Sequence, residues 1–168
     1  MVEPLEFRIM ERLAANHAAI AKDRGFFFDV DDAAVSIDAA VDAEALKDRP
    51  VVVVIEPGDS ESWQYEPGRQ ALVLMRAWVT WIASPLPLDH SQADGATTID
   101  RRARQLALWR ACADTARTLV EDPSLGGLVV DTRIVGRKWD REIDGLDVYV
   151  SIDLEIRTRR DFTRPGAY

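Results

Sequence analysis

Apolar side chains recur at helical spacing in two stretches of the chain. In residues 4–24 they run from Leu5 through Leu13 to Ile20, and Gly25 follows as a stop signal. Residues 98–121 show the same three- and four-residue steps after a threonine that can cap the helix. Asp122-Pro123 ends this second stretch, because the residue before a proline is pushed out of the helical region. The pattern predicts two long helices, each with one apolar face.

Other stretches have the patterns of strands. FFFDV at 26–30, PVVVVIEPG at 50–58, the run 71–83 and the run 128–135 after Gly126-Gly127 each predict one, with 50–58 buried on both faces. The strands 50–58 and 71–83 should pair as a hairpin across a turn-rich loop, 57–70. Residues 29–48 give only weak signals, for a short strand and one helical turn at 42–48. The Pro-rich segment 84–97 predicts a long surface loop.

The clearest element is the last strand, from Leu146 to Arg157. Six aliphatic residues alternate there with Asp147, Tyr149, Ser151, Asp153, Glu155 and Arg157. A strict period of two gives one buried face and one face toward solvent or a partner, as in an antiparallel sheet. The predicted fold is therefore α/β of the α+β kind. It is a single domain over residues 1–168, in which two long helices cover a mainly antiparallel sheet.

Charge narrows the possible partners. The 168-residue chain has a net charge of -8, which disfavours a ligand held through its phosphates. Residues 1–96 carry 8 basic and 17 acidic side chains, whereas 97–168 carry 13 and 12. This asymmetry suits head-to-tail contact between identical subunits. One cysteine and the absence of a signal peptide predict intracellular synthesis. Arg76 interrupts the longest apolar run, so we expect no transmembrane helix.

Candidate chemistry is sparse. His17, His90 and Cys112 have no metal ligand at suitable spacing, and we expect a helix-surface residue, a loop residue and a small packing residue. Asp153 and Glu155 share one face of a strand, as in nucleases that hold two divalent cations. This alternative is weakened because the strand is the last one, leaving too little chain for further carboxylates. The sequence predicts no enzyme, metal or cofactor.

The order of elements around the second helix resembles one known family. The helix that ends in EDPSLGGLVVDTRIVG, the polar connection WDREIDG and the long strand LDVYVSIDLEIRTRR are similar to the tail terminator, or tail completion, proteins of long-tailed bacteriophages. The N-terminal helix and RPVVVVIEPGDSES also resemble that family. The stretch 29–48 and the loop 84–97 depart from its pattern.

This resemblance implies a structural virion protein without enzymatic activity, made in the bacterial cytoplasm and located in the virion tail. Such proteins form a homohexameric ring on the tail tube, stop its polymerisation and join it to a head-tail connector or stopper protein. The implied partners are therefore self, the tail tube protein and the connector, with no membrane and no sequence-specific nucleic acid. The alternatives are another head-tail joining or minor tail protein, or the nuclease.

Within that role we expect subunit or tube contacts on the polar face of the last strand, on the loops 57–70 and 84–97, and on the basic tail that begins at Arg157. The individual residues predicted for these contacts are Trp63, Tyr65, Asp147, Tyr149, Asp153, Glu155, Arg157, Arg159 and Arg160.

Overall fold

A computed structural model describes residues 3–36, 49, 51–66, 70–83, 101–139 and 148–161. Its helices are α1 (Leu5–Ala18), a short 3-10 helix (Lys22–Arg24) and α2 (Arg101–Glu121). Its strands are β1 (Asp32–Val35), β2 (Val51–Glu66), β3 (Gln70–Ala83), β4 (Asp131–Trp139) and β5 (Val148–Asp161). The described strands form one sheet in the order β1-β2-β3-β5-β4. Only the β1–β2 pair among them is parallel. The fold is a single α+β domain with two helices on a mixed, mostly antiparallel sheet, as the broad prediction stated.

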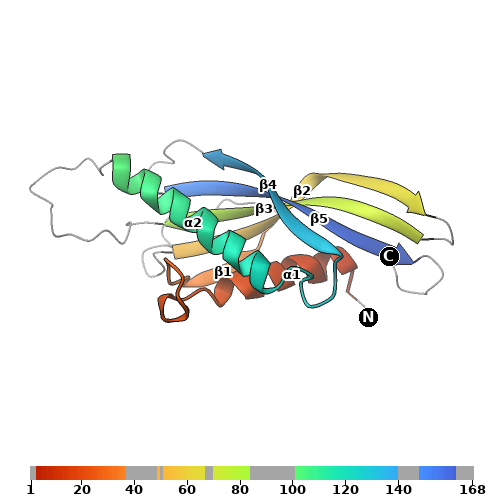
Figure 1. Cartoon of the computed structure of the whole chain (residues 1–168), viewed down its shortest axis with the longest axis horizontal. Helices are drawn as coiled ribbons and strands as arrows, with labels where there is room; N and C mark the ends of the chain where they lie inside the picture. Colours follow the sequence, from red (N-terminus) through yellow and green to blue (C-terminus); the bar gives the residue numbers. More distant parts are fainter. Residues whose placement is uncertain are drawn as a thin grey trace, which may run out of the picture.

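The hydrophobic core lies between the helices and one face of the sheet. Figure 1 shows both helices on that side, with the far ends of β2, β3 and β5 extending beyond them. The inward residues of β5 confirm the predicted alternation, since Val150, Ile152, Leu154 and Ile156 are fully buried. Trp81 of β3 fills the centre, and its indole nitrogen donates a 2.9 Å hydrogen bond to the Thr115 hydroxyl of α2. This bond fixes the position of α2 over the sheet.

The predicted strand at 26–30 is wrong. Its backbone is irregular, and the short strand β1 forms instead at 32–35, inside the stretch that gave only weak signals. The cause is Asp114, a buried residue of α2 whose carboxylate accepts 3.0 Å hydrogen bonds from the backbone N–H groups of Phe27 and Phe28. With these donors used by a helix, the segment cannot pair with a strand.

The predicted loop at 57–70 is also wrong, because β2 continues through most of it to Glu66. A bulge between Pro57 and Glu61 interrupts the pairing with β3. Gly58 lies in this bulge, and a Cβ atom there would come within 2.4 Å of the Arg76 Cβ. Glycine at this position therefore allows β2 and β3 to approach closely at the bulge.

The turn after α2 confirms the predicted helix stop. Gly126 and Gly127 have φ angles of 68° and 86°, which strain any residue with a Cβ atom. The Asp122 carboxylate accepts hydrogen bonds from the Gly126 N–H (2.8 Å), from Arg12 (2.9 Å) and from Asn16 (3.0 Å). Desolvation raises the pKa of Asp122, but these bonds together outweigh it and lower that pKa. One carboxylate thus ties the turn to α1.

β4 begins at Asp131 and ends at Trp139, several residues later than the predicted strand at 128–135. The segment from 157 to 161, predicted as part of a basic tail, belongs to β5. The predicted helical turn at 42–48 and the loop 84–97 lie outside the described residues. Among the residues that the structure describes, no helix has the length and apolar character needed to cross a membrane.

His17 differs most from its prediction as a helix-surface residue. Its side chain is fully buried, with the ring edge directed at Trp81 at a centroid distance of 6.3 Å. Nδ1 donates a 2.7 Å hydrogen bond to the Leu13 carbonyl, whereas Nε2 has no partner in the described part of the chain. Burial lowers the pKa of His17 from 6.5 to about 4, although the bond to Leu13 opposes this shift. Cys112 is buried as expected.

Candidate functional site

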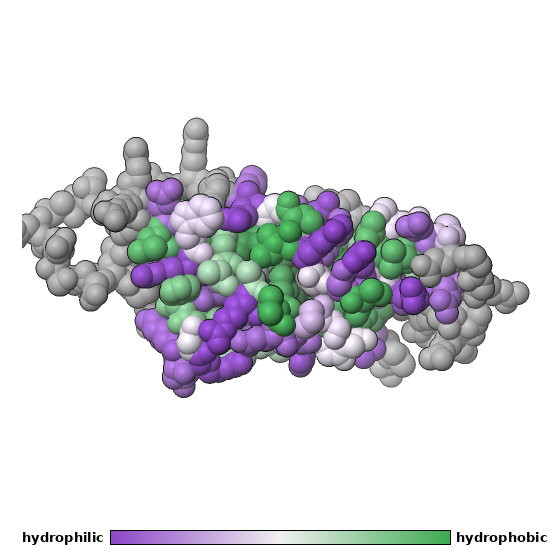
Figure 2. All heavy atoms as spheres, in the orientation of Figure 1, coloured by the Kyte–Doolittle hydropathy of each residue, from purple (hydrophilic) through white to green (hydrophobic). Residues whose placement is uncertain are grey.

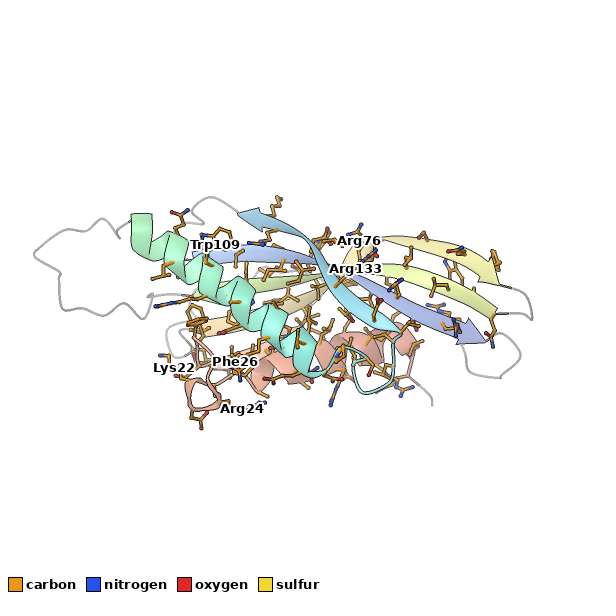
Figure 3. The ribbon with its side chains drawn as sticks, in the orientation of Figure 1. Lys22, Arg24, Phe26, Arg76, Trp109 and Arg133 are labelled. Carbon is orange, nitrogen blue, oxygen red and sulfur yellow. The ribbon has the colours of Figure 1, made fainter. Side chains whose placement is uncertain are left out.

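The face of the sheet opposite the helices carries a ladder of charged side chains across β3, β5 and β4. Arg76 contacts Asp153 at 3.3 Å and Glu155 at 3.9 Å, and Arg133 donates to Glu155 at 2.8 Å. Figure 3 shows Arg76 and Arg133 close together above the strands. Register explains the ladder, because Arg76, Glu155 and Arg133 are directly paired across the three strands.

A further ion pair, Arg157 with Asp131, extends this ladder along β5 and β4. The ladder then holds three arginines and three carboxylates, with no net charge. Each pair is partly exposed and contributes little to stability, about 0–1 kcal/mol. The ladder holds its side chains in position and presents a surface of charged groups with no net charge.

Asp153 and Glu155 do project from one face, as the sequence predicted. Both are occupied by arginines, so a divalent cation would have to displace guanidinium groups to reach them. Within the described residues, no group of three or more His, Cys, Asp or Glu side chains is arranged to hold a metal ion. This environment differs from the open carboxylate cluster that two-metal hydrolysis requires.

Beside the ladder lies a hollow of about 420 Å³ whose lining includes Glu56, Trp78, Ser151 and Asp153. The Thr80 hydroxyl donates to Glu56 at 3.1 Å and lies 3.2 Å from the Ser151 hydroxyl. Asp153 Oδ1 is buried and accepts no hydrogen bond from the described residues. The hollow combines carboxylates with an indole ring, a surface suited to polar contact with another molecule.

The other predicted contact residues lie at the end of the sheet or outside the described part. Tyr65 is 77% exposed and Trp63 is 38% exposed, both at the tip of the β2–β3 hairpin. Arg159 is exposed, but Arg160 is buried, with its guanidinium 4.6 Å from the Trp63 ring centre and in an ion pair with Glu6 of α1.

Arg160 therefore fastens α1 to the sheet and does not offer an accessible contact. Tyr149 lies in β5, but its side chain falls outside the description, and Asp147 lies outside the described residues altogether.

Sequence reasoning missed the two edges of the described sheet, formed by β1 and β4. Beside β1 lies a hollow of about 430 Å³ between that strand and α1, and beside β4 lies one of about 520 Å³ against α2. The first is lined mainly by small apolar residues, the second by Trp109, Ile134, Val135, Gly136 and Arg137. Neither hollow could be predicted from a local sequence pattern, because each lies between two segments that are far apart in the sequence.

A comparison with known protein families finds no match for this chain. A comparison with curated proteins finds no significant match either.

Proposed function

We propose that this chain is a tail terminator protein of a long-tailed bacteriophage or phage-like particle. In this role it forms a homohexameric ring at the end of the tail tube, stops tube polymerisation and provides the joining surface for the head connector or stopper. It acts in the virion tail as a structural protein, without a cofactor and without catalysis.

The observation that carries this proposal is the unit formed by α2, the turn after it and the β4–β5 hairpin. The resemblance to tail terminators rests on this order of elements, and the described fold has α2 followed by β4 and β5, which pair antiparallel. The two glycines allow the left-handed backbone of the turn, and Asp122 holds it by accepting a hydrogen bond from the Gly126 N–H. A ring protein needs such fixed geometry because each subunit must meet its neighbours at one angle.

The charged ladder supports a contact role over the nuclease alternative. Arginines neutralise Asp153 and Glu155, and an overall charge of -8 repels nucleic acid. A nuclease would show magnesium-dependent cleavage that disappears in Asp153→Asn. The proposed role predicts no such cleavage in the wild-type protein.

The decisive experiment is electron microscopy of particles assembled without this protein. We expect tails of abnormal and variable length that fail to join heads, and restoration of fixed-length joined tails when the wild-type protein is supplied. Tails of normal, fixed length in its absence would refute the proposal. A gold-labelled copy should decorate the head-proximal end of the tube, whereas labelling at the portal alone would favour another head-tail joining protein.

A further inference from the structure

We infer that copies of this chain join head to tail through the two edges of the described sheet, the α1–β1 edge of one copy packing against the β4 edge of the next. The α1–β1 edge is defined here as Phe7, Glu11, Ala15, Ala34 and Val35, and the β4 edge as Trp109, Ile134, Val135, Arg137 and Lys138. This inference rests on the proposed ring and names the surfaces that build it.

The α1–β1 edge offers a mainly apolar hollow of about 430 Å³ whose one charged lining residue among those described is Glu11. Phe7 is 43% exposed, and Ala15 and Ala34, which line the same hollow, are exposed as well. Glu11 lies in the same hollow and is exposed. Glu11 is the acidic residue that lines the hollow, whereas Asp32 of β1 and Glu6 of α1 are already paired with Arg49 and Arg160.

The β4 edge is apolar at its centre and basic around it. Val135 is 42% exposed and Trp109 is 51% exposed, with the Arg137 guanidinium 4.9 Å from the Trp109 ring centre. Arg133, Arg137 and Lys138 against Asp131 give the strand a charge of +2. Figure 2 shows apolar side chains lying among charged ones over α2 and β4. Glu11 on one edge and the basic residues on the other are therefore complementary in charge, and both edges have an apolar part.

The bulge at Val135 decides how the edges meet. It is the residue between the paired positions Ile134 and Gly136, where the register with β5 shifts. A bulge disturbs the regular row of backbone donors and acceptors, which discourages pairing with a further strand. Contact through side chains remains, with Val135 of one copy in the hollow between α1 and β1 of the next and the basic residues of β4 facing Glu11.

Position in the sheet gives the contact its symmetry. The order β1-β2-β3-β5-β4 puts the two edges at opposite ends of one sheet. A surface that meets a different surface on the next copy is heterologous, and such contacts close into rings when the rotation per subunit allows.

Cross-linking tests this contact directly. The full-length double variant Ala34→Cys with Val135→Cys, treated with a short bis-maleimide, should give a ladder of covalent multimers that ends at the ring size. The two single variants are the controls, because either one alone can link at most two copies. Cys112 is present in all three and is buried. A double variant that gives nothing beyond the products of the single variants would overturn the inference.

Substitutions that place the wrong charge on each edge provide the second measurement. In sedimentation velocity, Glu11→Arg should weaken self-association at least tenfold, and Val135→Asp should do the same. Asp23→Arg, with the same change in net charge away from both edges, and Val120→Asp, on an exposed part of α2, are matched controls that should associate as the wild type does. Thermal unfolding confirms that each variant folds. Unchanged association of Glu11→Arg and Val135→Asp, or a wild type that stays monomeric at its highest soluble concentration, contradicts the inference.

The inference and the proposed function fail separately. Rings that persist in both edge variants refute this interface while leaving tail termination intact. Normal tails without the protein refute tail termination, whatever the cross-links show.

Discussion

Burial of His17 predicts that the fold loses stability in mild acid. The ring is fully buried, and no described residue accepts a hydrogen bond from Nε2 that would stabilise the protonated ring. Burial therefore lowers the pKa of His17 to about 4, against 6.5 for an ordinary histidine. Below pH 6.5 the unfolded chain takes up a proton that the folded chain does not bind until the pH nears 4.

The size of this effect follows from the two pKa values. The difference between 6.5 and about 4 corresponds to about 3 kcal/mol, at 1.36 kcal/mol per pH unit. This stability is fully present above pH 6.5 and is lost as the pH falls to about 4. It is a large part of the 5–15 kcal/mol that stabilises a typical domain.

Urea denaturation of the wild type and of His17→Leu, at pH 7 and at pH 4, measures this effect. Carboxylates contribute equally to both proteins, so the variant should lose about 3 kcal/mol less than the wild type between the two pH values. At pH 7 His17→Leu should be close to the wild type in stability, since leucine fills a similar volume and leaves no unpaired nitrogen. Equal losses in the two proteins, or an NMR titration of His17 with a pKa near 6.5, would refute the reasoning.

Two further predictions concern carboxylates of the helical layer. Asp114→Ala should lower the free energy of unfolding by about 2–4 kcal/mol in urea denaturation, because the N–H groups of Phe27 and Phe28 lose their acceptor. Asp114→Asn keeps an acceptor and should lose less stability. Equal losses of stability in the two variants would contradict this role of Asp114. Asp122→Ala should cost about 2 kcal/mol at pH 7, where the carboxylate is ionised. The pKa of Asp122 is lower in the folded chain, so its contribution is fully present above the ordinary aspartate pKa and is lost as the pH falls through the folded-state pKa. The free energies of unfolding of the variant and the wild type should therefore converge in acid. A difference that stays constant with pH would contradict the role of the ionised carboxylate.

Elements whose cause is local were predictable from the sequence. The alternation in β5 and the β-branched run of Val51–Ile55 each report burial on a sheet face, and both are as predicted. The end of α2 was predictable for the same reason, since Asp122-Pro123 and the glycines act within a few residues. Leu13 and His17 lie one helical turn apart, so the apolar stripe of α1 contained a signal for the burial of His17.

Features that depend on distant partners were not predictable. The segment 26–30 has the composition of a strand, yet Asp114, 86 residues after Phe28, takes its backbone donors. The candidate site also depends on residues that are distant in the sequence. Asp153 and Glu155 were assigned to one face correctly, but their arginine partners come from β3 and β4, and the edges of the sheet follow only from strand order.

The place of β5 in the sheet has a consequence for synthesis on the ribosome. β5 is the last of the described strands in sequence, yet it lies inside the described sheet between β3 and β4, where Glu155 pairs with Arg76. Until β5 leaves the exit tunnel, β3 lacks one of its two neighbours in the described sheet and β4 lacks its only one there, so apolar strands with unpaired backbone groups are exposed. A chain that stops before residue 148 should therefore aggregate or recruit chaperones, because the described sheet is complete only when β5 has been added.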